Sequence, residues 1–180
     1  MSEGSYVFVM EDYDHAVSRG AKIYGEISGY GSLFSGSRNS DIENRVKKAG
    51  NAMKLCLDDA GASPEEIDLI NANGNSGKLP DLIEAKSIKE LFPEKGEEVP
   101  VHTIKSTLGE SYGASGAAQA ASALLSINNS LVPPTINCEE KDPGCNLNIV
   151  NEKLEKEVNT VLINSFDLSG NNSCLIVNKV

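Results

Sequence analysis

The chain has 180 residues, of which 39% are hydrophobic and 23% charged, and this composition is typical of one soluble globular domain. No apolar run approaches the roughly 20 residues of a membrane-spanning helix, and the start MSEGSYVF lacks the basic and apolar regions of a secretion signal. A net charge of −10 without any cluster of basic residues argues against binding to nucleic acid or to anionic membranes. We therefore expect a cytoplasmic protein.

The first 40 residues are predicted to form a strand, a helix, a second strand and a loop. Residues 6–11 are a short apolar run typical of a strand, residues 14–19 are predicted to form a helix that ends at Gly20, and residues 22–29 alternate as a strand does. Residues 29–40, GYGSLFSGSRNS, are rich in glycine and serine, which predicts a loop.

A long amphipathic helix is predicted over residues 42–60. Apolar residues recur there at steps of three and four, which places them on one helical face, and Gly61 supplies a stop signal. These apolar residues are Ile42, Val46, Ala49, Met53, Cys56 and Ala60. Ser63 and Glu66 then form a capping-box pattern before a strand predicted over residues 68–71.

The segment after this strand, INANGNSGK from Ile70 to Lys78, has the position but not the chemistry of an active site. A strand that ends in a polar, glycine-bearing turn presents side chains at the carboxyl edge of a sheet, where ligands usually bind in α/β folds. Asn73, however, carries an amide that does not titrate near neutral pH, so it cannot act as a general acid or base.

The second half of the chain continues the alternation of helices and strands. Residues 80–92 are predicted to form an amphipathic helix and residues 99–104 a strand, and the alternation predicts parallel pairing. Residues 112–127 form a helix rich in alanine, glycine and serine that we expect to be buried between layers. Two final strands, over residues 158–165 and 173–178, are joined by the loop FDLSGNN.

The cysteines and histidines give no sign of a metal centre or a redox site. Cys56, Cys138, Cys145 and Cys174 include no CxxC pair, so neither a zinc site nor a disulfide framework is indicated, and we expect reduced thiols, no metal and no cofactor. The two histidines, His15 and His102, are interpreted as a surface helix residue and a strand residue.

Six segments in register resemble the carboxyl-terminal half of β-ketoacyl-[acyl-carrier-protein] synthases, the elongating condensing enzymes of the thiolase superfamily. The segments are EDYDHAVSRGAKIYGEI, DDAGASPEEIDLINANG, KSTLGESYGASGAAQAASALLSI, LVPPTIN, DPGCNL and VLINSFDLSGNN. The resemblance implies a thiolase-like layered α/β fold with a mixed sheet between helices. It also implies that residues 1–35 are a strand, helix, strand remnant of the first thiolase half and that residues 36–180 form the C-terminal ketoacyl synthase domain.

The resemblance implies a degenerate active site. In this family a cysteine nucleophile belongs to the first half of the protein, and no cysteine of this chain lies in a similar stretch. Asn73 stands in NANGNSG where the family has its first histidine, Glu110 stands in KSTLGESYG where it has the second, and Lys105 matches the family lysine. An ion pair between Lys105 and Glu110 is the favoured interpretation, and a catalytic or ligand-binding role for Glu110 is the alternative.

The family's glycine-rich gate corresponds to DLSGNN in this chain, from Asp167 to Asn172. Leu168 takes the place of the gating aromatic residue and Asn171 that of another histidine. With Ser169, these residues are the predicted lining of a substrate pocket.

Three functional interpretations follow from the resemblance. The leading one is a non-catalytic, chain-length-factor-like subunit that shapes the acyl pocket of a partner in fatty acid or polyketide synthesis. The second is one half of a split ketosynthase or acyltransferase whose cysteine nucleophile is on another polypeptide. The third is a fragment of a longer chain.

The expected partner is a ketosynthase-like chain that carries the cysteine half, or a second copy of this chain. Strand edges in residues 6–29, with the apolar residues Val7, Val9, Ile23 and Ile27, would favour such pairing. Because acyl carrier proteins are acidic and this chain has a net charge of −10, we expect a carrier protein to be contacted mainly through the partner.

Overall fold

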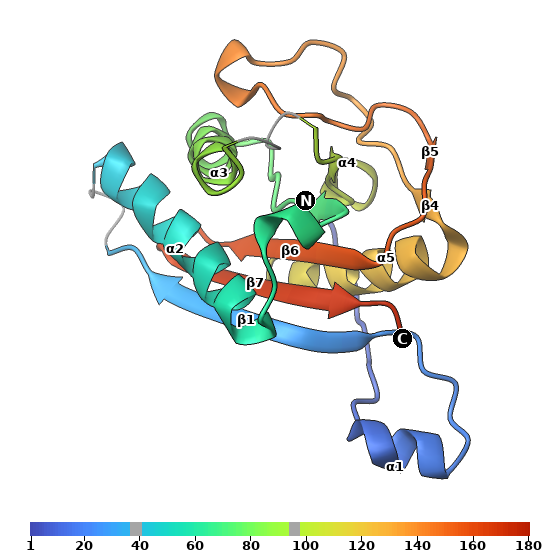
Figure 1. Cartoon of the computed structure of the whole chain (residues 1–180). Coiled ribbons are helices and arrows are strands. Elements are labelled where there is room, and N and C mark those ends of the chain that lie inside the picture. Colours follow the sequence, from blue (N-terminus) through green and yellow to red (C-terminus); the bar gives the residue numbers. More distant parts are fainter. Residues whose placement is uncertain (37–40, 94–97) are drawn as a thin grey trace.

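The computed structural model describes residues 1–36, 41–93 and 98–180, and its centre is a mixed sheet of five strands (Figure 1). In spatial order the strands are β1 (Glu26–Phe34), β7 (Asn171–Asn178), β6 (Thr160–Phe166), β2 (Leu69–Asn71) and β3 (Val101–His102). β7 runs antiparallel to both β1 and β6, whereas β2 runs parallel to both β6 and β3. The mixed sheet predicted from the sequence is therefore confirmed.

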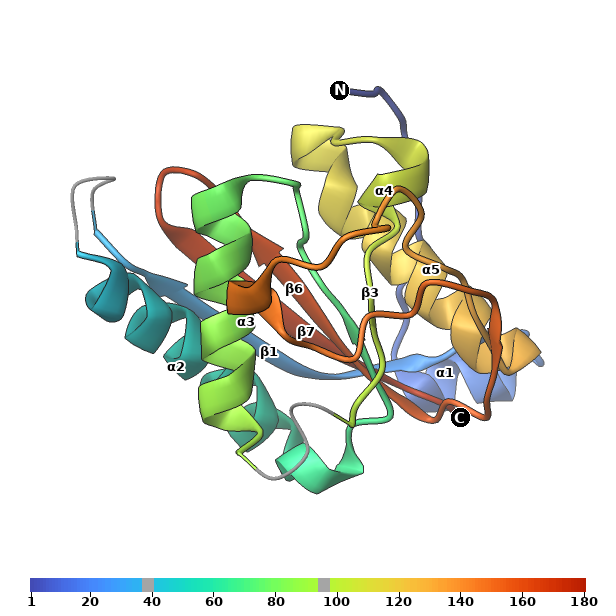
Figure 2. The same cartoon turned by 90° about the horizontal axis from the view of Figure 1, so that it is seen from above.

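Helices cover both faces of this sheet (Figures 1 and 2). Helices α2 (Ile42–Ala60) and α3 (Lys78–Leu91) pack on one face, where Leu162 of β6 joins their buried apolar residues. Helix α5 (Ser115–Asn129) packs on the other face, against Val161 and Ile163. Neighbouring residues of β6 thus enter different cores, as the alternation of side chains along a strand requires.

The shorter elements lie at the ends of these layers. They are α1 (Tyr13–Ser18), the 3₁₀ turn η1 (Pro64–Glu66), α4 (Lys105–Leu108), η2 (Tyr112–Ala114), β4 (Leu131–Val132), η3 (Pro143–Cys145) and β5 (Leu154–Glu155). Within the described ranges, no helix combines the length and the apolar character needed to cross a membrane.

Helix α2 has the bounds that its apolar periodicity predicts. The Asp41 carboxylate accepts a hydrogen bond from the Asn44 N–H (2.7 Å), which caps the first turn. Gly61 adopts a left-handed φ of 62° at the carboxyl end, a conformation that glycine reaches without steric cost. The helix lies so close to β1 that a Cβ on Gly31 would stand 2.2 Å from the Ala52 carbonyl oxygen, and glycine is required there.

The strand predicted over residues 6–11 is wrong. The segment forms no strand, and Val7 and Val9 remain 88% and 82% exposed. No strand of the described chain lies beside this segment to pair with it, because the sheet ends at β1. An apolar run becomes a strand only when a neighbour accepts its backbone hydrogen bonds.

The helix predicted over residues 14–19 is α1, but the bounds predicted for the strand over residues 22–29 and for the loop over residues 29–40 are wrong. β1 begins at Glu26 and continues to Phe34, through the glycine- and serine-rich stretch that was predicted to be a loop. Its small residues have a packing role, because they let β1 pair with β7 while α2 crosses closely above it. Residues 37–40, the end of the predicted loop, lie outside the described residues.

The later elements match the predictions more closely. The helix predicted over residues 80–92 is α3, and the two final strands are β6 and β7, joined by a tight loop. Parallel pairing is confirmed for β2 and β3, although β3 is shorter than the predicted strand over residues 99–104. The helix predicted over residues 112–127 consists of η2 followed by α5.

Candidate functional site

The polar turn after β2 is held in place by a buried carboxylate from α3. Glu84, 4% exposed, accepts hydrogen bonds from the N–H groups of Asn73 (2.8 Å) and Gly74 (2.9 Å) and from Nδ2 of Asn164 (3.0 Å). Burial raises the pKa of Glu84, and the three donors oppose this rise. The residue fixes the backbone of the turn, so the direction of the Asn73 side chain is set by α3.

A second carboxylate, Asp81, supports the outer part of the same turn. It accepts a hydrogen bond from the Asn75 N–H (3.1 Å). Burial, followed by the nearby charge of Glu84, raises the pKa of Asp81 to about 6. Sequence reasoning missed both carboxylates because a helix that begins beside a polar turn commonly carries acidic residues on its solvated side.

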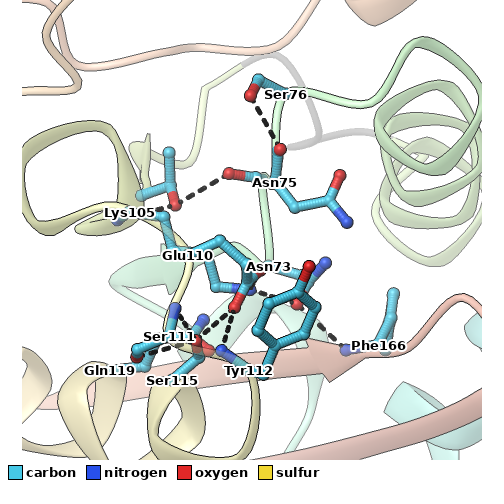
Figure 3. A network of polar contacts seen from close by, with 12 residues as sticks. Asn73, Asn75, Ser76, Lys105, Glu110, Ser111, Tyr112, Ser115, Gln119 and Phe166 are labelled. Atoms are coloured by element: carbon cyan, nitrogen blue, oxygen red, sulfur yellow. Dashed lines mark hydrogen bonds and ion pairs between the residues drawn. The ribbon is translucent and has the colours of Figure 1, made fainter. Parts of the chain in front are cut away.

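Asn73, Lys105 and Glu110 form one connected polar group (Figure 3). The Asn73 Oδ1 accepts hydrogen bonds from the Lys105 Nζ (2.7 Å) and from the Phe166 N–H (3.2 Å). The Lys105 ammonium, buried at the end of β3, also pairs with Glu110 Oε2 at 2.9 Å. The predicted ion pair between Lys105 and Glu110 is confirmed.

Glu110 is engaged by donors on several sides. It accepts hydrogen bonds from the Tyr112 N–H (2.8 Å) and, at close range, from the Ser115 hydroxyl at the start of α5. Partial burial alone would raise the pKa of Glu110, but the hydrogen bonds from Ser115 and Lys105 hold it below its usual range. The carboxylate is therefore ionised at neutral pH and acts only as an acceptor.

The electrostatics of this group differ from those of an oxyanion-binding site. Such a site needs hydrogen-bond donors aimed at a developing negative charge. Here the Lys105 ammonium is occupied by Asn73 and Glu110, and both hydrogen bonds of the Asn73 side chain use Oδ1. Glu110 itself has no proton to donate, so the position of the second family histidine offers an acceptor instead of a donor.

Gln119 is a site residue that sequence reasoning missed. The Nε2 of the fully buried Gln119 side chain donates to the backbone carbonyl oxygens of Ala72 (2.9 Å) and Asn164 (2.8 Å). In return, Asn71 Nδ2 donates to the backbone carbonyl oxygen of Gln119 (3.0 Å). Helix α5 is thereby joined to the ends of β2 and β6. The available signal was a long polar side chain on the buried face of an alanine-rich helix.

The predicted pocket residues of the loop between β6 and β7 lie on its surface. Leu168 is 46% exposed, Ser169 is exposed, and the Asn171 side chain donates to Asp167 Oδ2 (2.6 Å). A small crevice does lie beside this loop. It is lined by Ser35, Arg45, Asn75, Pro80, Ile83, Phe166, Asp167 and Asn172. The loop contributes Asp167 and the start of β7 contributes Asn172 to the crevice lining, which does not include the three predicted residues.

The cysteines and histidines of the described chain differ in chemical character from this polar group. Cys56 and Cys174 are buried, and burial raises the pKa of both thiols, that of Cys56 to about 12. His102 is 1% exposed in β3, and burial lowers its pKa to about 4. His15 is exposed on α1. Residues 1–36, 41–93 and 98–180 contain no group of three or more His, Cys, Asp or Glu suited to a metal ion.

The chain therefore has a layered α/β fold in which residues of the NANGNSG and KSTLGESYG motifs meet at one edge of a mixed sheet. Residues 24–139 match the family model of the β-ketoacyl synthase C-terminal domain, and the chain belongs to this family. Over its full length it is 37% identical to the 3-oxoacyl-[acyl-carrier-protein] synthase 2 of Coxiella burnetii. The chain spans 44% of the length of that relative.

Solved structures of condensing enzymes have the same fold. The ketosynthase of a type II polyketide synthase, in complex with its acyl-carrier protein, matches 94% of this chain with a TM-score of 0.89 and 29% identity. The ishigamide ketosynthase/chain length factor matches 93% with a TM-score of 0.83 and 34% identity. The chain covers 42% and 41% of these structures, respectively. Its fold is that of condensing enzymes of fatty acid and polyketide synthesis.

Proposed function

We propose that this chain is a non-catalytic ketosynthase-like subunit that shapes the acyl pocket of a partner chain in fatty acid or polyketide synthesis. The observation that carries the proposal is the ion pair between Lys105 and Glu110, with Asn73 bound to the same ammonium. The pair occupies the place that the resemblance gives to a catalytic histidine, and it puts a carboxylate, which only accepts hydrogen bonds, where the family has a donor.

The energetics of condensation support a loss of activity. Decarboxylation of a malonyl thioester develops negative charge on the carbonyl oxygen, and removing one donor to such an oxyanion costs about 2.7 to 4 kcal/mol, or roughly 10²- to 10³-fold in rate. Glu110 is ionised, so it would repel the developing charge in addition to providing no donor. The Asn73 amide could offset only part of this loss.

Three of the four thiols of the chain are poor nucleophiles. The thiolate is the reactive form of cysteine, and burial raises the pKa of Cys56 and Cys174 well above neutral pH. Cys145 is partly buried, and its pKa is raised first by burial and then by the charge of Asp142. None of these three thiols is poised to accept an acyl group.

An exposed apolar surface on the first 34 residues supports assembly with a partner. A concentration of exposed large apolar side chains in one segment is typical of a protein interface, and β1 is also an edge strand of the sheet. The exposed residues are Val7, Phe8, Val9, Met10, Tyr13, Val17, Tyr24, Ile27, Tyr30 and Phe34. The partner that fits is a ketosynthase-like chain that contains the part of the relatives outside the match, and a second copy is the alternative.

An acyl carrier protein would reach such an assembly mainly through the partner. The related ketosynthase structure was solved in complex with its acyl-carrier protein, which makes a carrier a plausible ligand of the whole assembly. Carrier proteins are acidic, whereas this chain has a net charge of −10, which makes it a poor candidate to supply the basic patch that electrostatic docking usually needs.

The test is to incubate the purified chain with malonyl- and acyl-carrier protein and to follow carbon dioxide release and the intact mass of the chain. We expect neither turnover nor an acyl adduct. Carbon dioxide release that persists in a preparation free of other synthases, and that is lost in Asn73→Ala, would overturn the proposal.

The same assay separates the proposal from a split enzyme. The chain is reconstituted with a cysteine-bearing partner, and the Asn73→Ala and Lys105→Met variants are compared with the wild type. A subunit that only shapes the pocket predicts changes in product length with decarboxylation retained. Loss of decarboxylation by at least 10²-fold in either variant would instead favour the split ketosynthase.

A further inference from the structure

The loop between β6 and β7 is organised around one carboxylate. Asp167 Oδ1 accepts hydrogen bonds from the N–H groups of Ser169 (2.7 Å), Gly170 (2.7 Å) and Asn171 (2.9 Å). Its second oxygen accepts from Asn171 Nδ2 (2.6 Å), and the Asp167 N–H donates to the Asn171 carbonyl (2.9 Å). Three successive backbone donors of a five-residue turn therefore share one acceptor.

The same loop is attached to the end of the neighbouring strand. The Gly170 carbonyl accepts hydrogen bonds from the Ser35 N–H (2.7 Å), the Ser35 hydroxyl (3.0 Å) and Asn172 Nδ2 (3.1 Å). Asn172 Nδ2 also donates to the Leu33 carbonyl (3.0 Å). Gly170 has a φ of +106°, and a Cβ there would stand 2.4 Å from the Gly36 carbonyl oxygen, so the tip is tightly packed on the chain that follows β1.

The base of the loop is tied to the candidate site. The Phe166 N–H, one residue before Asp167, donates to Asn73 Oδ1, the atom that also binds the Lys105 ammonium. A displacement of the loop would therefore have to break contacts with the site, with β1 and within the loop itself.

The charge state of Asp167 is suited to this role. Partial burial alone would raise its pKa, but the hydrogen bonds from the Asn171 side chain and from the three backbone N–H groups hold the pKa below its usual range. The carboxylate is ionised at neutral pH, and hydrogen bonds to an ionised acceptor are about twice as strong as neutral ones.

We propose that Asp167 is a positioning residue that locks the β6–β7 loop in one conformation, so that the loop is a fixed wall and not a moving gate. The proposal extends the pocket-shaping function proposed above and rests on it. A locked loop holds the exposed Leu168 side chain at a constant place, so the surface that the loop presents to the acyl pocket of a partner would be set in advance instead of adjusting to each substrate.

The decisive experiment is residue-resolved amide hydrogen exchange by NMR on the purified chain. We expect the amides of Ser169, Gly170 and Asn171 to be protected in the wild type and to exchange at least about tenfold faster in Asp167→Ala, because each loses a bond to an ionised acceptor. The amides of β6, and those of β7 beyond Asn171, should keep their rates. Unchanged exchange of the loop amides in Asp167→Ala would overturn the proposal.

Two further variants distinguish positioning from a general loss of stability. Asp167→Asn keeps one acceptor oxygen and should restore part of the protection. Asp142→Ala is the matched control, because Asp142 Oδ1 likewise accepts a hydrogen bond from a backbone N–H, that of Gly144 (2.7 Å), in the turn η3. It should leave the β6–β7 loop unchanged, and equal loop acceleration in this control would count against a specific role of Asp167.

The wild-type chain decides the matter if Asp167→Ala does not fold. A locked loop requires protection of the three amides in the wild type, and free exchange at all three would reject it. None of these measurements involves a partner or turnover, so a mobile loop would leave the non-catalytic function standing, and decarboxylation by the chain would leave the locked loop standing.

Discussion

The polar groups at the edge of the sheet and the apolar side chains of the first 34 residues differ in whether they find partners within the chain. At the edge, charged and polar groups are buried, and Glu84, Lys105 and Gln119 each find several partners. In the first 34 residues, apolar side chains such as Val7 and Val9 face solvent. The usual distribution of residue types is inverted in both places. The comparison teaches that the polar edge is stabilised by contacts within the chain, whereas the first segment is suited to contacts with another chain.

Because the polar edge is held together by buried hydrogen bonds, replacing its residues should lower the stability of the fold, and we expect the largest loss at Glu84. Glu84→Ala would leave the Asn73 and Gly74 N–H groups and the Asn164 amide without their buried acceptor. We expect a loss of about 3 to 5 kcal/mol in the free energy of unfolding, measured by urea denaturation. Glu90→Ala, at an exposed position of the same helix, is the control, and an equal loss in both variants would refute the role of Glu84.

The ion pair should show measurable coupling, since its lysine is buried. A double-mutant cycle with Lys105→Met and Glu110→Gln isolates the energy of the pair from the other contacts of each residue. We expect a coupling energy of about 1 to 3 kcal/mol in urea denaturation. A value near zero would mean that Glu110 is held by Ser115 and Tyr112 alone, and the site would then be better interpreted as open to a ligand.

The buried His102 and the partly buried Asp81 should have opposite effects on stability below pH 7. The pKa of His102 falls from 6.5 to about 4 on folding, so stability is lost as the pH drops through this range. The pKa of Asp81 rises from 3.8 to about 6, so stability is gained as the pH drops from 6 towards 3.8. In the wild type, the two effects partly cancel.

Asp81→Asn tests this cancellation. It removes the acid-side gain and leaves the loss from His102, so the melting temperature should fall more steeply between pH 6.5 and 4 than in the wild type. At pH 7 the variant should melt a few degrees higher, about 2 to 4 °C, because the cost of ionising a largely buried carboxyl is removed. Parallel profiles of the two proteins would contradict the assignment.

The exposed first segment predicts the smallest effect on folding and a clear effect on assembly. Val7→Asp and Val9→Asp should change the free energy of unfolding of the dissociated chain by less than about 0.5 kcal/mol, since both side chains already face solvent. Both should weaken self-association or partner binding in sedimentation experiments at several concentrations. Val180→Asp, at another exposed valine, is the control. A monomeric wild type that also binds no ketosynthase-like partner would refute the docking role.

Local patterns predicted the helices and the later strands well. The period of α2 and its stop at Gly61 depend on neighbours along the chain, so the sequence alone carries them. The ion pair was predictable for a similar reason, because only the short α4 and the turn at Gly109 separate Lys105 from Glu110.

Features that depend on tertiary pairing were not predictable. Residues 6–11 have a strand-like composition but no neighbour to pair with, and the glycines of β1 indicated a loop although α2 requires them for close packing. Glu84 and Asp167 resembled ordinary surface acids beside turns. Their importance lies in backbone N–H groups that only the folded turns bring together.

The three-way attachment of Gln119 has a mechanical consequence for α5. The side-chain amide of Gln119 donates to the carbonyl groups of Ala72 and Asn164, and its backbone carbonyl accepts from Asn71. The helix therefore cannot slide along its axis or rotate without breaking these hydrogen bonds. Ala72 immediately precedes Asn73. A displacement or rotation of the C-terminal half of α5, where Leu125 is exposed, would therefore be transmitted through the helix to Asn73.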